Sequence, residues 1–229
     1  MNGNISALLS EDDTPPDGVH RTVHCEDAIS WLHSQERLAG SVITSLPDVS
    51  GTSLALDEWR GWFADTVALT IDRCADNAVA IFYQTDVKIA GCWIDKGELC
   101  QRGAARAGAA LLWHKIVLRK PPGTVCFGRP SFSHMLCFSR ALRPPLARST
   151  ADVIQAGDMT WSQAMGINAC RVACEFIAKQ TEDRIIVDPF CGKGTVLAVA
   201  NALGLDAVGV EIMRRRARNA KRLRITLSE

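Results

Sequence analysis

Two spacings of apolar residues alternate along this chain, and they predict a series of strands and helices. Short apolar runs bounded by polar residues predict strands over 21–24, 41–44, 78–83, 111–118, 132–138, 185–188 and 207–210. Apolar residues repeating every three or four positions predict helices over 28–38, 54–74, 96–110, 167–179 and 196–202, and a basic exposed helix over 214–224. Strands that alternate with helices indicate a parallel sheet covered on both faces.

Two parts of the chain depart from this alternation. The strands 111–118 and 132–138 have no helix between them, so we expect them to pair antiparallel. Residues 1–18 are polar and acidic with Pro15-Pro16, which predicts a disordered lead, and residues 143–159 read as a linker. The length of 229 residues suits one α/β domain over 19–229 with a mostly parallel sheet.

The segment 185–195 is the most informative part of the sequence. A strand rich in β-branched residues runs into Asp188, then Gly192-x-Gly194 and Thr195 open a helix. The glycines let the backbone approach a ligand, and the helix start offers free N–H groups. The next strand ends at Glu211, where a carboxylate can accept hydrogen bonds from ribose hydroxyls. Together these features predict a β-α-β unit that binds a nucleoside.

Charge is distributed unevenly, although the net charge is only +1. Residues 1–98 hold 6 basic and 16 acidic side chains, whereas residues 99–151 hold 9 basic and no acidic ones. A long stretch without carboxylates is typical of a surface that contacts phosphates, although a solvated basic face is the alternative. The nine cysteines are scattered and form no Cys-x-x-Cys, which favours reduced thiols in an intracellular protein. No apolar run approaches a membrane span, and no cluster has metal-ligand spacing, so we expect neither membrane insertion nor a metal.

The run Asp188-Pro-Phe-Cys-Gly-Lys-Gly-Thr195 resembles motif I of S-adenosylmethionine-dependent amino methyltransferases that act on nucleic acids. That family commonly has serine where Lys193 stands. Ser45-Leu46-Pro47-Asp48, directly after a strand, resembles the family's motif IV, whose pattern is Ser, Asp or Asn, then Pro-Pro and an aromatic residue. Motif IV before motif I is the order of the circularly permuted class. The resemblance therefore implies a Rossmann-like class I methyltransferase fold with a permuted chain.

The resemblance also implies which residues form the site. Ser45, Leu46, Pro47 and Asp48 would be catalytic, since a motif IV loop aims the target nitrogen at the methyl group of the cofactor with oxygen acceptors. The cofactor would be S-adenosyl-L-methionine, bound by Asp27, Gly166, Asn168, Asp188, Pro189, Phe190, Gly192, Gly194, Thr195 and Glu211. Substrate contacts are expected from polar and basic side chains at the sheet edge and in the basic stretch: Gln84, Asp86, Lys88, Arg102, Arg106, Arg119 and Lys120.

Motif IV departs from the family pattern at two positions. Leu46 replaces the first proline, and Asp48 replaces the aromatic residue that stacks on an extruded base. Asp48 could act as a general base, which would suit a ring imide nitrogen better than an exocyclic amine. Alternatively, Asp48 caps the turn that follows Pro47.

These features favour an enzyme that methylates a base nitrogen in RNA, such as tRNA or rRNA, because little sequence is left for a DNA target-recognition insert. A DNA amino methyltransferase is the first alternative. A non-catalytic nucleic-acid-binding protein on a methyltransferase scaffold is the second, because motif IV is altered. The sequence does not define the oligomeric state.

Overall fold

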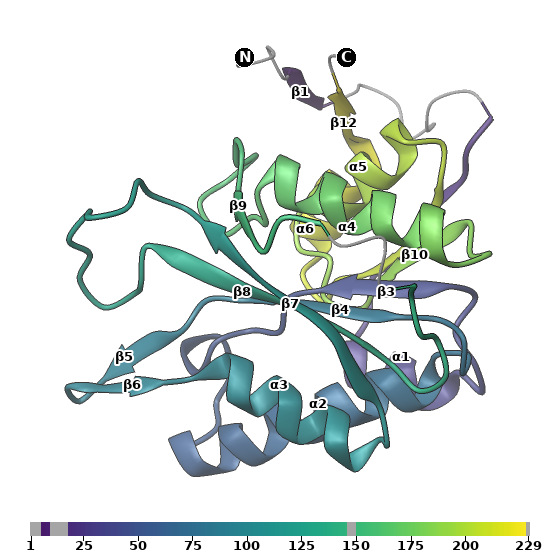
Figure 1. Cartoon of the computed structure of the whole chain (residues 1–229). Coiled ribbons are helices and arrows are strands. Elements are labelled where there is room, and N and C mark those ends of the chain that lie inside the picture. The colour runs from purple at the N-terminus through teal and green to yellow at the C-terminus, as the bar shows by residue number, and fades with distance from the viewer. Residues whose placement is uncertain (1–5, 10–17, 146–149, 228–229) are drawn as a thin grey trace.

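The computed structural model describes residues 6–9, 18–145 and 150–227. An eight-stranded sheet forms its centre (Figure 1). Five neighbouring strands are parallel, and the strand that follows them, together with its hairpin partner, supplies the antiparallel pair. In sheet order the strands are β2 (Arg21–His24), β11 (Asp206–Val210), β10 (Ile185–Asp188), β3 (Ser41–Thr44), β4 (Ala80–Gln84), β8 (Phe132–Ser139), β7 (Ala110–Leu118) and β9 (Val153–Gln155).

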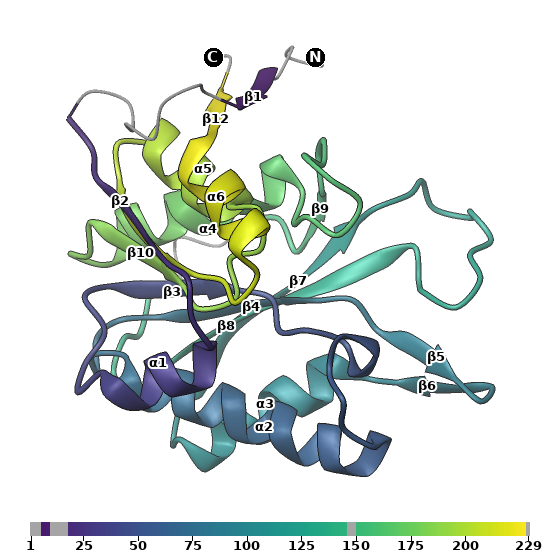
Figure 2. The ribbon, with the colours of Figure 1, turned by 180° about the vertical axis from the view of Figure 1, so that it is seen from behind.

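Helices cover both faces of the sheet. One layer holds α1 (Ala28–Ser34), α2 (Leu56–Arg73) and α3 (Lys96–Arg106), and the other holds α4 (Ile167–Gln180), α5 (Thr195–Ala202) and α6 (Arg214–Arg222) (Figures 1 and 2). Each layer buries its own apolar cluster against the sheet, one around Trp59 and Phe63 of α2, the other around Ile177 of α4 and Leu197 of α5. The predicted α/β fold with its antiparallel strand pair is confirmed.

Three features of the fold differ from the sequence prediction. The expected linker contains β9, which adds a parallel edge strand beside β7. The chain after β4 forms a hairpin of β5 (Val87–Ile89) and β6 (Cys92–Ile94), whose two turn residues both have positive φ. A separate ribbon pairs β1 (Ser6–Leu9) with β12 (Leu223–Thr226), so part of the expected disordered lead is a strand; the remainder, 1–5 and 10–17, lies outside the described residues.

β5, β6 and β9 escaped prediction because each has only three residues, too few to show a period of two. The helix expected over 28–38 also ends early, at Ser34, and Leu38 continues as a loop residue toward β3. Within the described ranges, no helix has the length and apolar content needed to cross a lipid bilayer.

The chain order brings the two sequence motifs together at the centre of the sheet. β10 and β3 are parallel neighbours, with Ile186 opposite Ser41 and Val187 opposite Val42. The helix after β10 lies on one face and the helix after β3 on the other. Ligands of open α/β sheets bind in the crevice at such a switch point, outside the carboxyl ends of the strands.

Candidate active site

A cavity of about 1000 Å³ opens at this switch point. Its walls come from the segments that follow β10, β11, β3 and β4, together with the start of α3 and the loop before α4. Residues from both sequence motifs line it, including Asp188 and Gly192 from one and Ser45 to Asp48 from the other. The fold therefore joins the predicted cofactor loop and the predicted catalytic loop in one space.

Asp188 lies at the centre of the cavity wall. Its Oδ1 accepts a hydrogen bond from Thr44 Oγ1 at 2.6 Å and another from the Phe190 N–H at 3.1 Å. Burial raises the pKa of Asp188 to about 7, although these two donors act in the opposite direction. The Asp188–Thr44 bond also links β10 to β3, so the acid fixes the relative position of the two motif loops.

The two glycines of the loop serve different contacts. Gly192 has φ +56°, and an added Cβ would lie 3.0 Å from the ring of Trp161 on the cavity wall. Gly194 has φ +84° and does not line the cavity; an added Cβ would lie 2.6 Å from the Cα of Ala220 in α6. Gly194 is therefore required by the packing of α6 on the loop.

The remaining cofactor residues of the loop and of the neighbouring strands lie as expected. Pro189, Phe190 and Thr195 line the cavity, and Thr195 Oγ1 lies 2.5 Å from Thr160 Oγ1. Glu211 lines the cavity at the end of β11, where its Oε1 accepts from the Met213 N–H at 2.7 Å. Asp27 reaches the cavity after β2 while capping α1 through the Ser30 N–H at 2.9 Å.

Gly166 and Asn168 do not reach the cavity. Gly166 begins α4, where a Cβ would lie 2.2 Å from the carbonyl oxygen of Ala156, and Asn168 Nδ2 donates to the Gln155 carbonyl at 2.7 Å. Both residues attach α4 to the segment that contains β9. Ala164 and Met165, just before them, line the cavity instead.

Trp161 is a site residue that the sequence analysis missed. Its ring lies on the cavity wall above Gly192, with Lys193 Nζ 5.0 Å and the Arg216 guanidinium 5.3 Å from the ring centroid. Cations at these distances are attracted to the face of an indole ring. Lys193, the departure from the family motif, therefore helps hold Trp161 over the cofactor loop. Trp161 lies between the expected linker 143–159 and the helix expected from residue 167. No periodic pattern of apolar residues covers this position.

The motif IV loop presents side chains of different exposure. Ser45 is exposed at the end of β3, whereas Leu46 is buried in the core below the loop. The Pro47 carbonyl accepts a hydrogen bond from Trp59 Nε1 at 3.3 Å, which attaches the loop to α2. Trp59 is thus a core residue that also positions the loop.

Asp48 pairs with two cations that are distant in sequence. Lys96 Nζ binds one carboxylate oxygen and Arg129 binds the other. Lys96 is only 2% exposed, and burial, followed by the charge of Arg129, lowers its pKa to about 7. The two partners therefore occupy both oxygens of the Asp48 carboxylate. Asp48 stands at the N-cap position of the short helix Val49–Gly51, but its side chain makes no cap hydrogen bond there.

Among the expected substrate residues, Gln84 and Arg119 line the cavity. The Gln84 side chain is buried, and both its amide atoms lack a hydrogen-bond partner within the described part of the chain. Lys120 is exposed next to Arg119. Lys88 projects on β5, 5.8 Å from the ring centroid of Trp93.

Two further expected substrate residues point away from the cavity. Arg102 pairs with Glu98 at 2.7 Å on the exposed side of α3, and Arg106 pairs with Asp65 of α2. Neither arginine lines the cavity. The basic stretch is therefore divided between these surface ion pairs and the loop that contains Arg119, Lys120 and Arg129.

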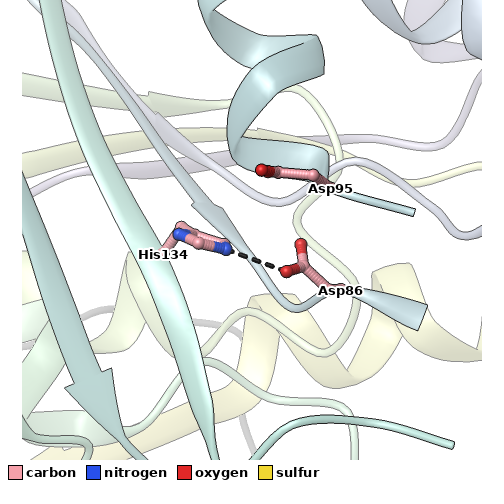
Figure 3. Close-up of side chains that lie close together, drawn as sticks. All are labelled: Asp86, Asp95 and His134. Carbon is pink, nitrogen blue, oxygen red and sulfur yellow. Dashed lines mark hydrogen bonds and ion pairs between the residues drawn. The ribbon is translucent and has the colours of Figure 1, made fainter. Parts of the chain in front are cut away.

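Asp86 belongs to a cluster that sequence spacing does not show. Asp86, Asp95 and His134 offer ligand atoms within 4.8 Å of one another, from the end of β4, the start of α3 and the strand β8 (Figure 3). Asp86 Oδ2 lies 3.0 Å from His134 Nε2, and Asp86 Oδ1 accepts from the Lys96 backbone N–H at 2.9 Å. The cluster holds α3 in place and thereby positions Lys96 beside Asp48.

Comparison with known proteins supports this assignment of the motifs. Residues 177–222, which include β10, α5 and β11, match the model of the N6_N4_Mtase family, described as DNA methylase. No curated protein sequence matches the chain.

Solved structures share the fold. A Thermus thermophilus protein named as a DNA modification methylase has a TM-score of 0.68 at 20% identity, over 88% of this chain and 92% of that one. Its complex with S-adenosyl-L-methionine has a TM-score of 0.65 at 18% identity, over 88% and 93%. The cytosine-N4-specific PvuII DNA methyltransferase has a TM-score of 0.68 at 15% identity, over 89% and 86%. At these identities the likeness establishes the fold.

The fold and the family match over the motif I segment support the same class of protein, an S-adenosylmethionine-dependent amino methyltransferase. The predicted resemblance, enzyme class and cofactor are confirmed at this level. The preference for RNA finds no support, because the matched family and the similar structures carry the names of DNA methylases.

Proposed function

We propose that this protein transfers a methyl group from S-adenosylmethionine to the exocyclic amino nitrogen of a base in DNA. The observation that carries the proposal is the single cavity shared by the Asp188–Glu211 side and the Ser45–Asp48 loop. A methyl donor on one side and a base on the other would meet there. The names of the matched family and of the similar structures favour DNA over the RNA substrate expected from the sequence.

The cofactor would occupy the side of the cavity formed by the β10 and β11 ends. Glu211 would accept hydrogen bonds from the ribose hydroxyls, and the Gly192 backbone would allow close approach of the methionine part. Trp161 would cover the cofactor from the α4 side. These roles rest on the lining of the cavity and on the motif resemblance.

The ion pairs of Asp48 favour an amine over a ring imide as the target. A general base must accept a proton, but both carboxylate oxygens of Asp48 are already occupied by Lys96 and Arg129. An exocyclic amine attacks as a neutral group: its nitrogen bonds to the methyl carbon, the sulfur keeps the electron pair of the broken S–CH3 bond, and the surplus proton leaves afterwards. Acceptors near Ser45 and the Leu46 carbonyl would direct the lone pair along the S–CH3 axis.

The experiment that tests the substrate is methyl transfer from tritium-labelled S-adenosylmethionine to unmethylated plasmid DNA and, in parallel, to unmodified tRNA and rRNA transcripts. The proposal predicts label in DNA and little in RNA. Label only in RNA would instead support the RNA methyltransferase that was expected from the sequence. No label in either, together with no calorimetric binding of S-adenosylmethionine, would favour the non-catalytic scaffold.

Asp48→Asn tests the choice of nucleophile. Since Asp48 is not the base in this account, transfer measured per folded molecule should stay within about 10-fold of the parent, whereas loss of a general base costs about 10²–10⁴-fold. A loss of the larger size, partly restored by raising the pH, would identify an imide target instead.

A further inference from the structure

The loop that joins β7 to β8, residues 119–131, extends away from the body of the fold (Figure 1). It carries Arg119, Lys120 and Arg129 and no acidic residue. The hairpin of β5 and β6 extends on the same side, and the Lys88 N–H in β5 donates to the Gly128 carbonyl at 2.9 Å. The loop and the hairpin therefore support each other and form one projecting arm.

The loop is ordered by its own hydrogen bonds. The N–H groups of Arg119 and Lys120 donate to the Ser131 carbonyl at 2.8 and 3.1 Å, which closes the base of the loop. Near the tip, the Thr124 hydroxyl donates to the Pro121 carbonyl at 2.7 Å. These contacts give the side chains between them defined positions before any partner binds.

An aromatic ring on this loop faces solvent. Phe127 is 92% exposed and the neighbouring Val125 is 78% exposed. Single exposed apolar residues are common, but this ring lies within a stretch of positive charge, which is the combination that stacks on bases while cations contact phosphates. The positive charge of this loop favours nucleic acid as its partner over an apolar protein surface.

The same loop also reaches the mouth of the cavity. Arg119 and Arg129 line it, and Arg129 pairs with Asp48 of the motif IV loop. Phe127 lies two residues before Arg129, so their Cα atoms are at most about 7 Å apart. The backbone at Phe127 is therefore close in the chain to an arginine that lines the cavity.

We propose that Phe127 is a wedge that enters the base stack of duplex DNA beside the target base, while Arg119, Lys120 and Arg129 contact the adjacent phosphates. This inference rests on the proposed function. A base inside a duplex must be extruded before its amino group reaches a cavity, and the extrusion leaves a gap in the stack. An apolar side chain that fills the gap lowers the cost of extrusion.

The test compares duplex with single strands. Parent, Phe127→Ala, Phe127→Trp and the same-loop control Val125→Ala are assayed for methyl transfer to native and to heat-denatured plasmid DNA. Phe127→Ala should lose about 10-fold or more on native DNA and stay within about 2-fold on denatured DNA, because only the duplex needs a wedge. Phe127→Trp and Val125→Ala should retain parental activity on both. Since Phe127 is exposed, thermal unfolding and S-adenosylmethionine affinity should match the parent.

Equal activity of parent and Phe127→Ala on native DNA would overturn the wedge and leave the DNA methyltransferase intact. If Phe127→Ala loses the same activity on native and on denatured DNA, Phe127 contributes to DNA binding in general, and the wedge is overturned as well. If the parent methylates neither native nor denatured DNA, the proposed function is wrong, and the wedge that rests on it is wrong too.

Discussion

Replacing Lys96 with methionine should remove a rise in the stability of the fold between pH 7 and pH 9. The Lys96 side chain is only 2% exposed. Burial, and after it the charge of Arg129, lower its pKa from 10.5 to about 7. The folded parent therefore releases the Lys96 proton above pH 7, whereas the unfolded chain keeps it.

The sign and size follow from proton linkage. When the folded pKa of a cation lies below the unfolded value, the unfolded state binds more protons between the two values, so stability rises with pH in that window. With a folded pKa of about 7 for Lys96, the free energy of unfolding should rise by about 2 kcal/mol between pH 7 and pH 9. Lys96→Met should lack this rise, because it has no amine to titrate.

Urea unfolding at pH 7, 8 and 9 measures the effect. Two proteins are compared: the parent and Lys96→Met, which lacks the titrating amine. Other titrating groups, such as the cysteines, are common to both and cancel in the comparison. If Lys96→Met retains the rise of the parent, Lys96 is not the group responsible and the reasoning fails.

Three further substitutions test the cofactor side. Glu211→Ala should weaken S-adenosylmethionine binding by about 1–3 kcal/mol in calorimetry, the cost of a lost charge-assisted hydrogen bond, and unchanged affinity would remove Glu211 from the site. Trp161→Ala should also weaken cofactor binding without unfolding the protein, since its ring covers the Gly192 loop from outside the core; a parental dissociation constant would count against that role. Gly194→Ala should destabilise the fold by about 2–4 kcal/mol through its positive φ and its collision with Ala220. The control Gly204→Ala, with positive φ but nothing within 4 Å, should cost only about 1–2 kcal/mol, and equal losses would show that the collision does not matter.

Elements with a clear period or a turn signature were predictable from the sequence. The strands and helices on either side of Asp188, and the strand before Ser45, lie where their apolar spacing placed them. The positions of Asp188 and Glu211 on the cavity wall followed from strand-end geometry alone. Gly194 was correctly marked as a glycine position but for the wrong contact, because its neighbour Ala220 lies on a helix whose packing the sequence does not reveal.

The surroundings of Asp48 could not be predicted. Its partners Lys96 and Arg129 lie 48 and 81 residues away in the sequence, Arg129 within the undivided basic stretch and Lys96 just before it. Trp161 escaped for a similar reason, since its cationic neighbours Lys193 and Arg216 belong to other segments. Local patterns predict elements and strand ends, whereas contacts across the sheet edge depend on how loops from distant segments pack.

The most direct test of the central claim identifies the product. Unmethylated plasmid DNA is incubated with the parent protein and S-adenosylmethionine carrying a trideuterated methyl group, digested to nucleosides and analysed by mass spectrometry. The account predicts a trideuterated methyl group on an exocyclic amino nitrogen, as N6-methyladenine or N4-methylcytosine. Label at a ring nitrogen or a ring carbon, or no labelled nucleoside from a protein that binds the cofactor, would contradict it.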